Sequence, residues 1–149
     1  STYDIFKDNI YKRYFNFDLI QAPFNIFDAN SRKIKMFKQI KKNKEIHIRS
    51  IFLQGLVLNE QNANSSYKSI KDKLNIMDNL ISKKNIKNRY QYVISLINNL
   101  NIADYCIIGC LNHYEIENLN KFKSSKINLK DLYKFQIKNK KILDLRNWN

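Results

Sequence analysis

Apolar residues recur along the chain with two different spacings, which predicts helices alternating with short strands. Segments with an apolar residue at every third or fourth position, and polar residues between them, are typical of amphipathic helices. They predict helices at residues 4–15, 31–44, 67–83, 87–100, 113–122 and 129–137. Short apolar runs bounded by charged or turn-forming residues indicate buried strands. They predict strands at residues 17–22, 45–52 and 104–109.

The order of these elements predicts an α/β fold built on a parallel sheet. Parallel neighbours need a connection long enough to hold a helix, and a helix stands between each predicted strand and the next. We expect one domain over residues 1–149, with a polar loop near residues 59–66. Three strands by themselves leave both sheet edges unpaired and one face poorly covered. The predicted elements therefore indicate part of a larger sheet.

Length and hydropathy exclude two classes of protein. A chain of 149 residues is too short for a whole (β/α)8 barrel, which typically needs about 250 residues. No apolar run approaches the roughly 20 residues that cross a bilayer, so we expect no membrane protein. The first residues show no basic segment followed by an apolar stretch, so no secretory signal is expected. The sequence predicts a cytoplasmic protein.

The formal charge of +14 favours, at first sight, a partner with phosphate groups. Only five of the 27 basic residues are arginine, however, and the lysines are scattered through every polar segment. A nucleic-acid binder usually concentrates arginine and exposed aromatic residues on one face. We therefore expect a solvated basic surface and no nucleic-acid partner, with a basic nucleic-acid or membrane-surface module as the alternative.

The cysteines and histidines indicate neither a disulfide nor a metal site. Cys106 and Cys110 are four residues apart in a predicted strand, which places their α-carbons about 13 Å apart. A disulfide needs less than about 7 Å, so we expect reduced thiols. His47 and His113 lack the spacings of zinc ligands, and His47 is expected to be an interior histidine without a catalytic role.

Three segments, in this order, resemble the second half of the aldo/keto reductases. Residues 18–25 are similar to the family's Asp-x-x-Gln-x-Pro-Tyr-Asn strand, and residues 48–56 to its Arg/Tyr-Ser-Pro-Leu-x-x-Gly-Leu segment, with Ile51 in place of the proline. Residues 107–118 resemble the last strand and the helix that holds the nucleotide end of the cofactor. Residues 1–4 resemble the end of the preceding strand, and residues 144–148 the Asp-Pro-Arg-x-Trp ending of some members. That ending predicts a genuine carboxyl terminus, with the missing part at the front.

The resemblance implies a partial (β/α)8 TIM barrel, namely strands 6 to 8 with their helices. The complete enzyme would use NADPH (or NADH) to transfer a hydride to or from a small carbonyl or sugar-like substrate. This part would supply the wall that binds the cofactor, through Ser1, Thr2, Gln21, Arg49, Ser50, Phe52, Gln54, Gly55, Gly109, Glu117 and Asn118. The family's catalytic Tyr, Lys, Asp and His belong to the first half, so we assign no catalytic residue here.

The resemblance also implies a role for each group of residues. The Gln21 amide would pair with the nicotinamide carboxamide, and Arg49 would stack on the ring or meet the phosphates. Residues 50–55 would wrap the pyrophosphate through backbone N–H groups. Glu117 and Asn118 would hold the adenine end. Glu115 stands where members that prefer NADP often have Arg, so the preferred cofactor stays open.

The missing half has a physical consequence for the chain by itself. The inner and outer faces of three strands would be left exposed, so we expect the isolated chain to be unstable, to aggregate, or to pair with the amino-terminal half of the barrel. A barrel fragment that is retained only as a scaffold is the other alternative. Such a fragment would bind neither a cofactor nor a nucleic acid.

Overall fold

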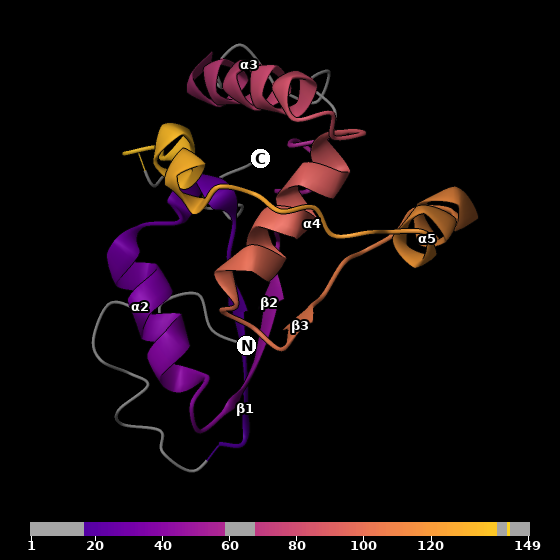
Figure 1. Cartoon of the computed structure of the whole chain (residues 1–149). Helices are drawn as coiled ribbons and strands as arrows, with labels where there is room; N and C mark the ends of the chain where they lie inside the picture. Colours follow the sequence, from indigo (N-terminus) through magenta and orange to yellow (C-terminus); the bar gives the residue numbers. More distant parts are fainter. Residues whose placement is uncertain (1–16, 59–67, 140–142, 144–149) are drawn as a thin grey trace.

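The chain folds around a small parallel sheet. The computed structural model describes residues 17–58, 68–139 and 143. Strands β1 (Leu19–Pro23), β2 (Glu45–Arg49) and β3 (Tyr105–Cys106) lie in the order β1-β2-β3, with both pairings parallel (Figure 1). The predicted α/β class and parallel sheet are therefore confirmed. The helix expected at residues 4–15 and the loop expected at 59–66 lie outside the described residues.

Helices and 3-10 turns connect and follow the strands. They are η1 (Ile26–Asp28), α2 (Ser31–Ile40), α3 (Lys68–Lys83), α4 (Arg89–Leu100), α5 (His113–Asn120) and η4 (Leu129–Phe135). Asparagine starts many of them, because its side-chain oxygen accepts a backbone N–H of the first turn. Asn30, Asn88 and Asn112 cap α2, α4 and α5 in this way. The abundance of asparagine thus has a local structural use.

Several elements are shorter than the sequence predicts. β2 ends at Arg49 because Ser50 adopts a left-handed backbone conformation with φ 61°. The helix predicted to reach residue 44 ends at Ile40, where the Lys41 N–H donates to the carbonyls of Phe37 and Gln39. The strand predicted at residues 104–109 is reduced to two residues, and the last predicted helix is a 3-10 helix. The element types are otherwise as predicted for the described residues.

The sheet has one buried face and one partly open face. Ile20 and Ala22 of β1 and Ile46 and Ile48 of β2 are buried, in the same apolar core as side chains from α2, α3 and α4. The alternating residues of both strands are exposed or half-buried. On that second face the register brings together Gln21, His47 and Tyr105, one from each strand. In both β1 and β2, buried side chains therefore alternate with more exposed ones, as expected for a sheet that is covered on one face.

Polar contacts hold the short β3 against β2. The Asp104 carboxylate accepts the backbone N–H of Ile46 at 2.8 Å, and the Ile107 N–H donates to the Ile48 carbonyl at 2.7 Å. Lys41 donates to the Ala103 carbonyl at 2.8 Å and lies 3.4 Å from Asp104. These bonds extend the attachment of β3 at both of its ends.

Helix α5 stands apart from the other elements. Figure 1 shows it at the end of two extended segments, beside the sheet and the other helices. None of its residues is buried, and Tyr114 and Ile116 are exposed, as is Leu111 just before the helix, at 93% of its full surface. Within the described part of the chain, α5 therefore has an uncovered apolar face.

Candidate functional site

A cavity of about 540 Å³ lies where the chain leaves β2 and β3. Its walls come from the segments after these two strands, from the α3–α4 corner and from α5. The lining residues are Phe52, Leu58, Asp78, Ile81, Ser82, Lys87, Asn88, Arg89, Tyr90, Ile108, Gly109, Cys110, Glu115 and Asn118. In parallel α/β sheets, ligands bind beyond the carboxyl ends of the strands, and sites of about 300–1,000 Å³ hold small molecules. The cavity meets both criteria.

Two stacked aromatic rings form one wall of the cavity. The centroids of Phe52 and Tyr90 are 5.2 Å apart, and the ring planes differ by 21°. The Tyr90 hydroxyl is buried and has no hydrogen-bond partner among the described residues. Burial raises the pKa of Tyr90 to about 12, and the nearby Cys110 and Glu115 add to the rise. Tyr90 therefore stays protonated at neutral pH and presents an O–H donor that no described residue accepts.

The formal charges that line the cavity balance, with two acidic and two basic residues. The Arg89 guanidinium binds the Asp78 carboxylate through Nε at 2.7 Å and Nη2 at 2.5 Å, which ties α4 to α3. Lys87 is exposed at the rim. Glu115 of α5 lines the cavity, and its carboxylate accepts the Leu111 backbone N–H at 2.8 Å. An apolar and aromatic cavity with balanced charge suits a planar ring better than a bare phosphate.

The structure brings some of the residues that the sequence indicates to this cavity. Phe52, Gly109 and Asn118 line it, although they come from three separate segments. Glu117 does not line it, because its carboxylate is exposed and lies 3.2 Å from Lys121. Glu115 occupies the cavity wall instead.

A second group of predicted residues lies at the carboxyl edge of the sheet. Gln21 is half-buried in β1, and its α-carbon pairs with that of His47. Arg49 ends β2 and donates to the Ser50 hydroxyl at 3.3 Å. These residues do not line the cavity, so the predicted site falls into two groups. Ser1 and Thr2 lie outside the described residues.

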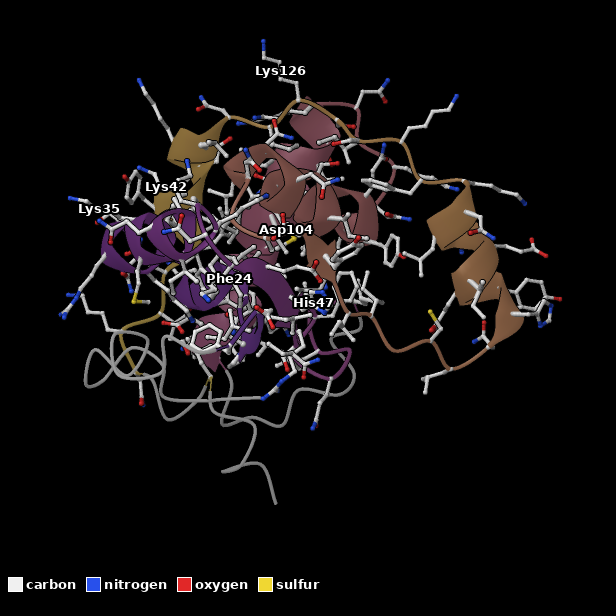
Figure 2. All side chains as sticks on the ribbon, turned by 90° about the horizontal axis from the view of Figure 1, so that it is seen from below. Phe24, Lys35, Lys42, His47, Asp104 and Lys126 are labelled. Carbon is white, nitrogen blue, oxygen red and sulfur yellow. The ribbon has the colours of Figure 1, made fainter. Side chains whose placement is uncertain are left out.

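His47 belongs to the open face of the sheet, where two side chains hold it. Its Nε2 lies 2.6 Å from the Glu45 carboxylate, and its ring meets the Tyr105 ring edge-on with centroids 4.9 Å apart. Figure 2 shows His47 on the sheet, away from the labelled lysines of α2. These contacts fix the orientation of the ring, but His47 is half-buried on the open face of the sheet and is not the interior histidine that the sequence predicted.

The segment after β2 is a packed turn. Leu53, Gln54 and Gly55 all have positive φ, and Ile51, Leu53, Leu56 and Val57 are buried. Four of its backbone N–H groups donate to carbonyls of the same turn, namely those of Leu53, Leu56, Val57 and Leu58. Because these four N–H groups already donate to carbonyls, a phosphate bound at this turn would need other hydrogen-bond donors. Gln54 and Gly55 lie at the tip, outside the cavity lining.

The sequence missed the contribution of the α3–α4 corner. The sequence predicted only that an amphipathic helix starts here. In the structure, four residues at this start line the cavity, namely Lys87, Asn88, Arg89 and Tyr90. A weak signal was present, since Asn88 is a typical capping residue and places Arg89 and Tyr90 in the first turn of α4. Nothing in the sequence indicated that this turn would face the residues after β3.

Comparison of the chain with models of known protein families, with curated proteins and with solved structures finds no match. The likeness to aldo/keto reductases therefore depends on the motifs quoted above. Among the helices that the structure describes, none is long and apolar enough to cross a membrane. The described residues also contain no group of three His, Cys, Asp or Glu side chains placed to hold a metal ion.

Proposed function

We propose that this chain is the cofactor-binding part of an NAD(P)H-dependent oxidoreductase of the aldo/keto reductase type. The observation that supports it best is the cavity at the carboxyl ends of β2 and β3, because Phe52, Gly109 and Asn118 meet there. These three residues come from three separate segments of the chain that the resemblance indicates. Their convergence is the arrangement expected of a ligand site in a parallel α/β fold.

In this proposal the cavity takes the adenine end of the dinucleotide. The stacked rings of Phe52 and Tyr90 provide an apolar wall for a base, and the Tyr90 hydroxyl provides a donor for an acceptor on the ligand. The nicotinamide end would lie toward Gln21 and Arg49, at the carboxyl edge of the sheet. The bound nicotinamide would supply the hydride, while this chain binds and orients it.

The surfaces left open support a barrel that is completed by other strands. Within the described residues, β1 and β3 each have one edge without a strand neighbour, and one sheet face is only partly covered. The apolar side chains of Leu111, Tyr114 and Ile116 are exposed around α5. Exposed apolar surface of this kind usually marks a contact with another element or chain. A complementary barrel half would cover the edges and this face together.

A direct test is titration of the full chain with NADPH and with NADH, followed by the fluorescence of the nicotinamide. We expect saturable binding that is weakened about fivefold or more by Tyr90→Phe, which removes the buried donor and keeps the ring; one hydrogen bond contributes about 1 kcal/mol. Asn118→Ala is expected to weaken binding as well. A matched control, Tyr133→Phe, removes an exposed hydroxyl far from the cavity and should leave binding unchanged.

Failure of both cofactors to bind a folded preparation would overturn the proposal. Equal weakening by Tyr133→Phe would place the ligand elsewhere. The oligomeric state gives a separate check, because open edges predict that the isolated chain self-associates or aggregates. A chain that remains monomeric and does not aggregate in sedimentation experiments would contradict the proposal that a barrel half is missing.

A further inference from the structure

A second hollow lies on the other side of the described structure, between α2 and η4. It is a groove of about 510 Å³ that shares no lining residue with the cofactor cavity. One wall consists of Ser31, Ile34, Lys35, Lys38 and Gln39 of α2 with Lys42 of the turn that follows it, and the opposite wall of Leu100, Leu129, Leu132 and Tyr133. The proposed oxidoreductase function gives this groove no role.

The groove has an apolar floor. Leu100 and Leu132 are buried, and Ile34 is half-buried, so these side chains lie below the surface of the surrounding residues. Tyr133 is 64% exposed and stands on the η4 side, beside the partly exposed Leu129. A concave apolar strip of this kind accepts the apolar face of a helix laid into it.

The rim on the α2 side carries positive charge without compensation inside the groove. Lys35, Lys38 and Lys42 are exposed, and Figure 2 shows Lys35 of α2 and Lys42 of the following turn on the side where η4 lies. No described residue forms an ion pair with any of the three, and none of the lining residues that the structure describes is acidic. Three like charges on one rim favour a partner with negative charge.

The spacing of the lysines indicates the shape of that partner. Lys35 and Lys38 stand at i and i+3 of α2, about 5 Å apart along the helix axis. Lys42 follows in the turn after the helix, where Lys41 keeps a helical backbone conformation. Carboxylates at a similar spacing on a second helix would face them. We propose that this groove binds an acidic amphipathic helical segment of another protein, with apolar side chains on the floor and carboxylates at the lysine rim.

Other anionic partners fit the groove less well. A membrane would need apolar side chains that protrude, whereas Leu100 and Leu132 lie at the bottom of a hollow. A nucleic acid would leave the aliphatic floor without use, and its bases prefer aromatic or guanidinium surfaces for stacking. Both partners serve as outcomes of the test.

The test uses the full chain and a fluorescein-labelled peptide of about 18 residues, with leucine at i, i+4 and i+7 and glutamate on the flanks. Binding is followed by fluorescence anisotropy. The variant Lys35→Glu, Lys38→Glu, Lys42→Glu should bind roughly tenfold or more weakly, because three surface ion pairs are lost together. The matched control reverses three exposed lysines of α3, in Lys68→Glu, Lys71→Glu, Lys83→Glu, and should lose less than about threefold.

A second variant tests the apolar part without changing the charge. Tyr133→Ser removes an exposed ring, so folding should be preserved, and the affinity for the peptide should fall by about threefold or more. Thermal melts of all variants confirm that they remain folded. Neither the Lys35→Glu, Lys38→Glu, Lys42→Glu variant nor Tyr133→Ser should alter the NADPH titration. This proposal and the cofactor proposal can therefore fail separately.

Three results would overturn the proposal. The first is equal loss of peptide binding in the α2 and α3 triple variants, which would indicate general attraction to a basic chain. The second is equal binding of a peptide with the same composition in scrambled order. The third is absence of peptide binding while an RNA oligonucleotide or anionic vesicles bind through the same three lysines.

Discussion

Replacing Asp131 should reveal how much the two ion pairs of this buried carboxylate contribute to holding η4 against the end of α3. The Asp131 carboxylate is 6% exposed and accepts hydrogen bonds from Lys84 at 2.8 Å and from Lys134 at 2.8 Å. Burial by itself would raise the pKa of this carboxyl, but the hydrogen bonds from Lys134 and Lys84 and their charges outweigh it. The pKa therefore lies below its usual range.

The magnitude follows from how exposed the two partners are. A hydrogen bond to a charged group contributes about 1.5–3 kcal/mol when buried, and an exposed ion pair contributes about 0.2–1 kcal/mol. The Lys84 side chain is 28% exposed and that of Lys134 is 52% exposed, so each interaction should contribute less than a fully buried hydrogen bond to a charged group. Asp131→Asn should therefore lower the free energy of unfolding by about 2 kcal/mol at pH 7.

The sign of the pH dependence is fixed by the lowered pKa. The stabilisation is present above the unfolded-state pKa of about 3.9 and is lost as the pH falls through the folded-state value below it. Urea unfolding of the parent and of Asp131→Asn, repeated from pH 7 to pH 3, should show the difference shrinking only in the acid range. Asp72→Asn, an exposed acid of α3, is the control and should change the stability by less than about 0.5 kcal/mol. A parent and Asp131→Asn that unfold alike at pH 7 would refute the reasoning.

Three substitutions and one labelling experiment give further expected outcomes. Asn25→Ala removes the cap of η1, whose side chain accepts the N–H groups of Phe27 at 3.0 Å and Asp28 at 3.1 Å, and should cost about 1 kcal/mol in urea unfolding. Gly55→Ala should cost about 1 kcal/mol because φ is 85°, whereas Gly109→Ala, where an added Cβ meets nothing within 4 Å, should not alter stability. Burial raises the pKa of the Cys106 thiol to about 11, so iodoacetamide at pH 8 should modify Cys106 far more slowly in the folded than in the unfolded chain, as mass spectrometry can show.

The elements of the fold were largely predictable because their signals are local. The alternation in β1 and β2 and the helical spacing in α3 and α4 each depend on residues close in the sequence. The ends of elements were less predictable. β2 stops where Ser50 takes a positive φ, a conformation that no residue type in that segment requires.

The candidate site was predictable only in part because its residues meet through tertiary contacts. Phe52, Gly109 and Asn118 came from motifs in three segments. Arg89 and Tyr90 line the same cavity, and there Arg89 pairs with Asp78 of α3. No periodicity in the sequence encodes that pairing.

Photo-crosslinking with an azido-adenine analogue of NADP tests the central claim most directly, because it marks where the adenine end lies. The full chain is irradiated with the analogue, with and without excess NADPH, and the labelled peptides are mapped by mass spectrometry. The account predicts labelling around Phe52, Tyr90 and residues 108–118, removed by NADPH. Labelling confined to the lysines of α2, or labelling that NADPH does not reduce, would contradict it.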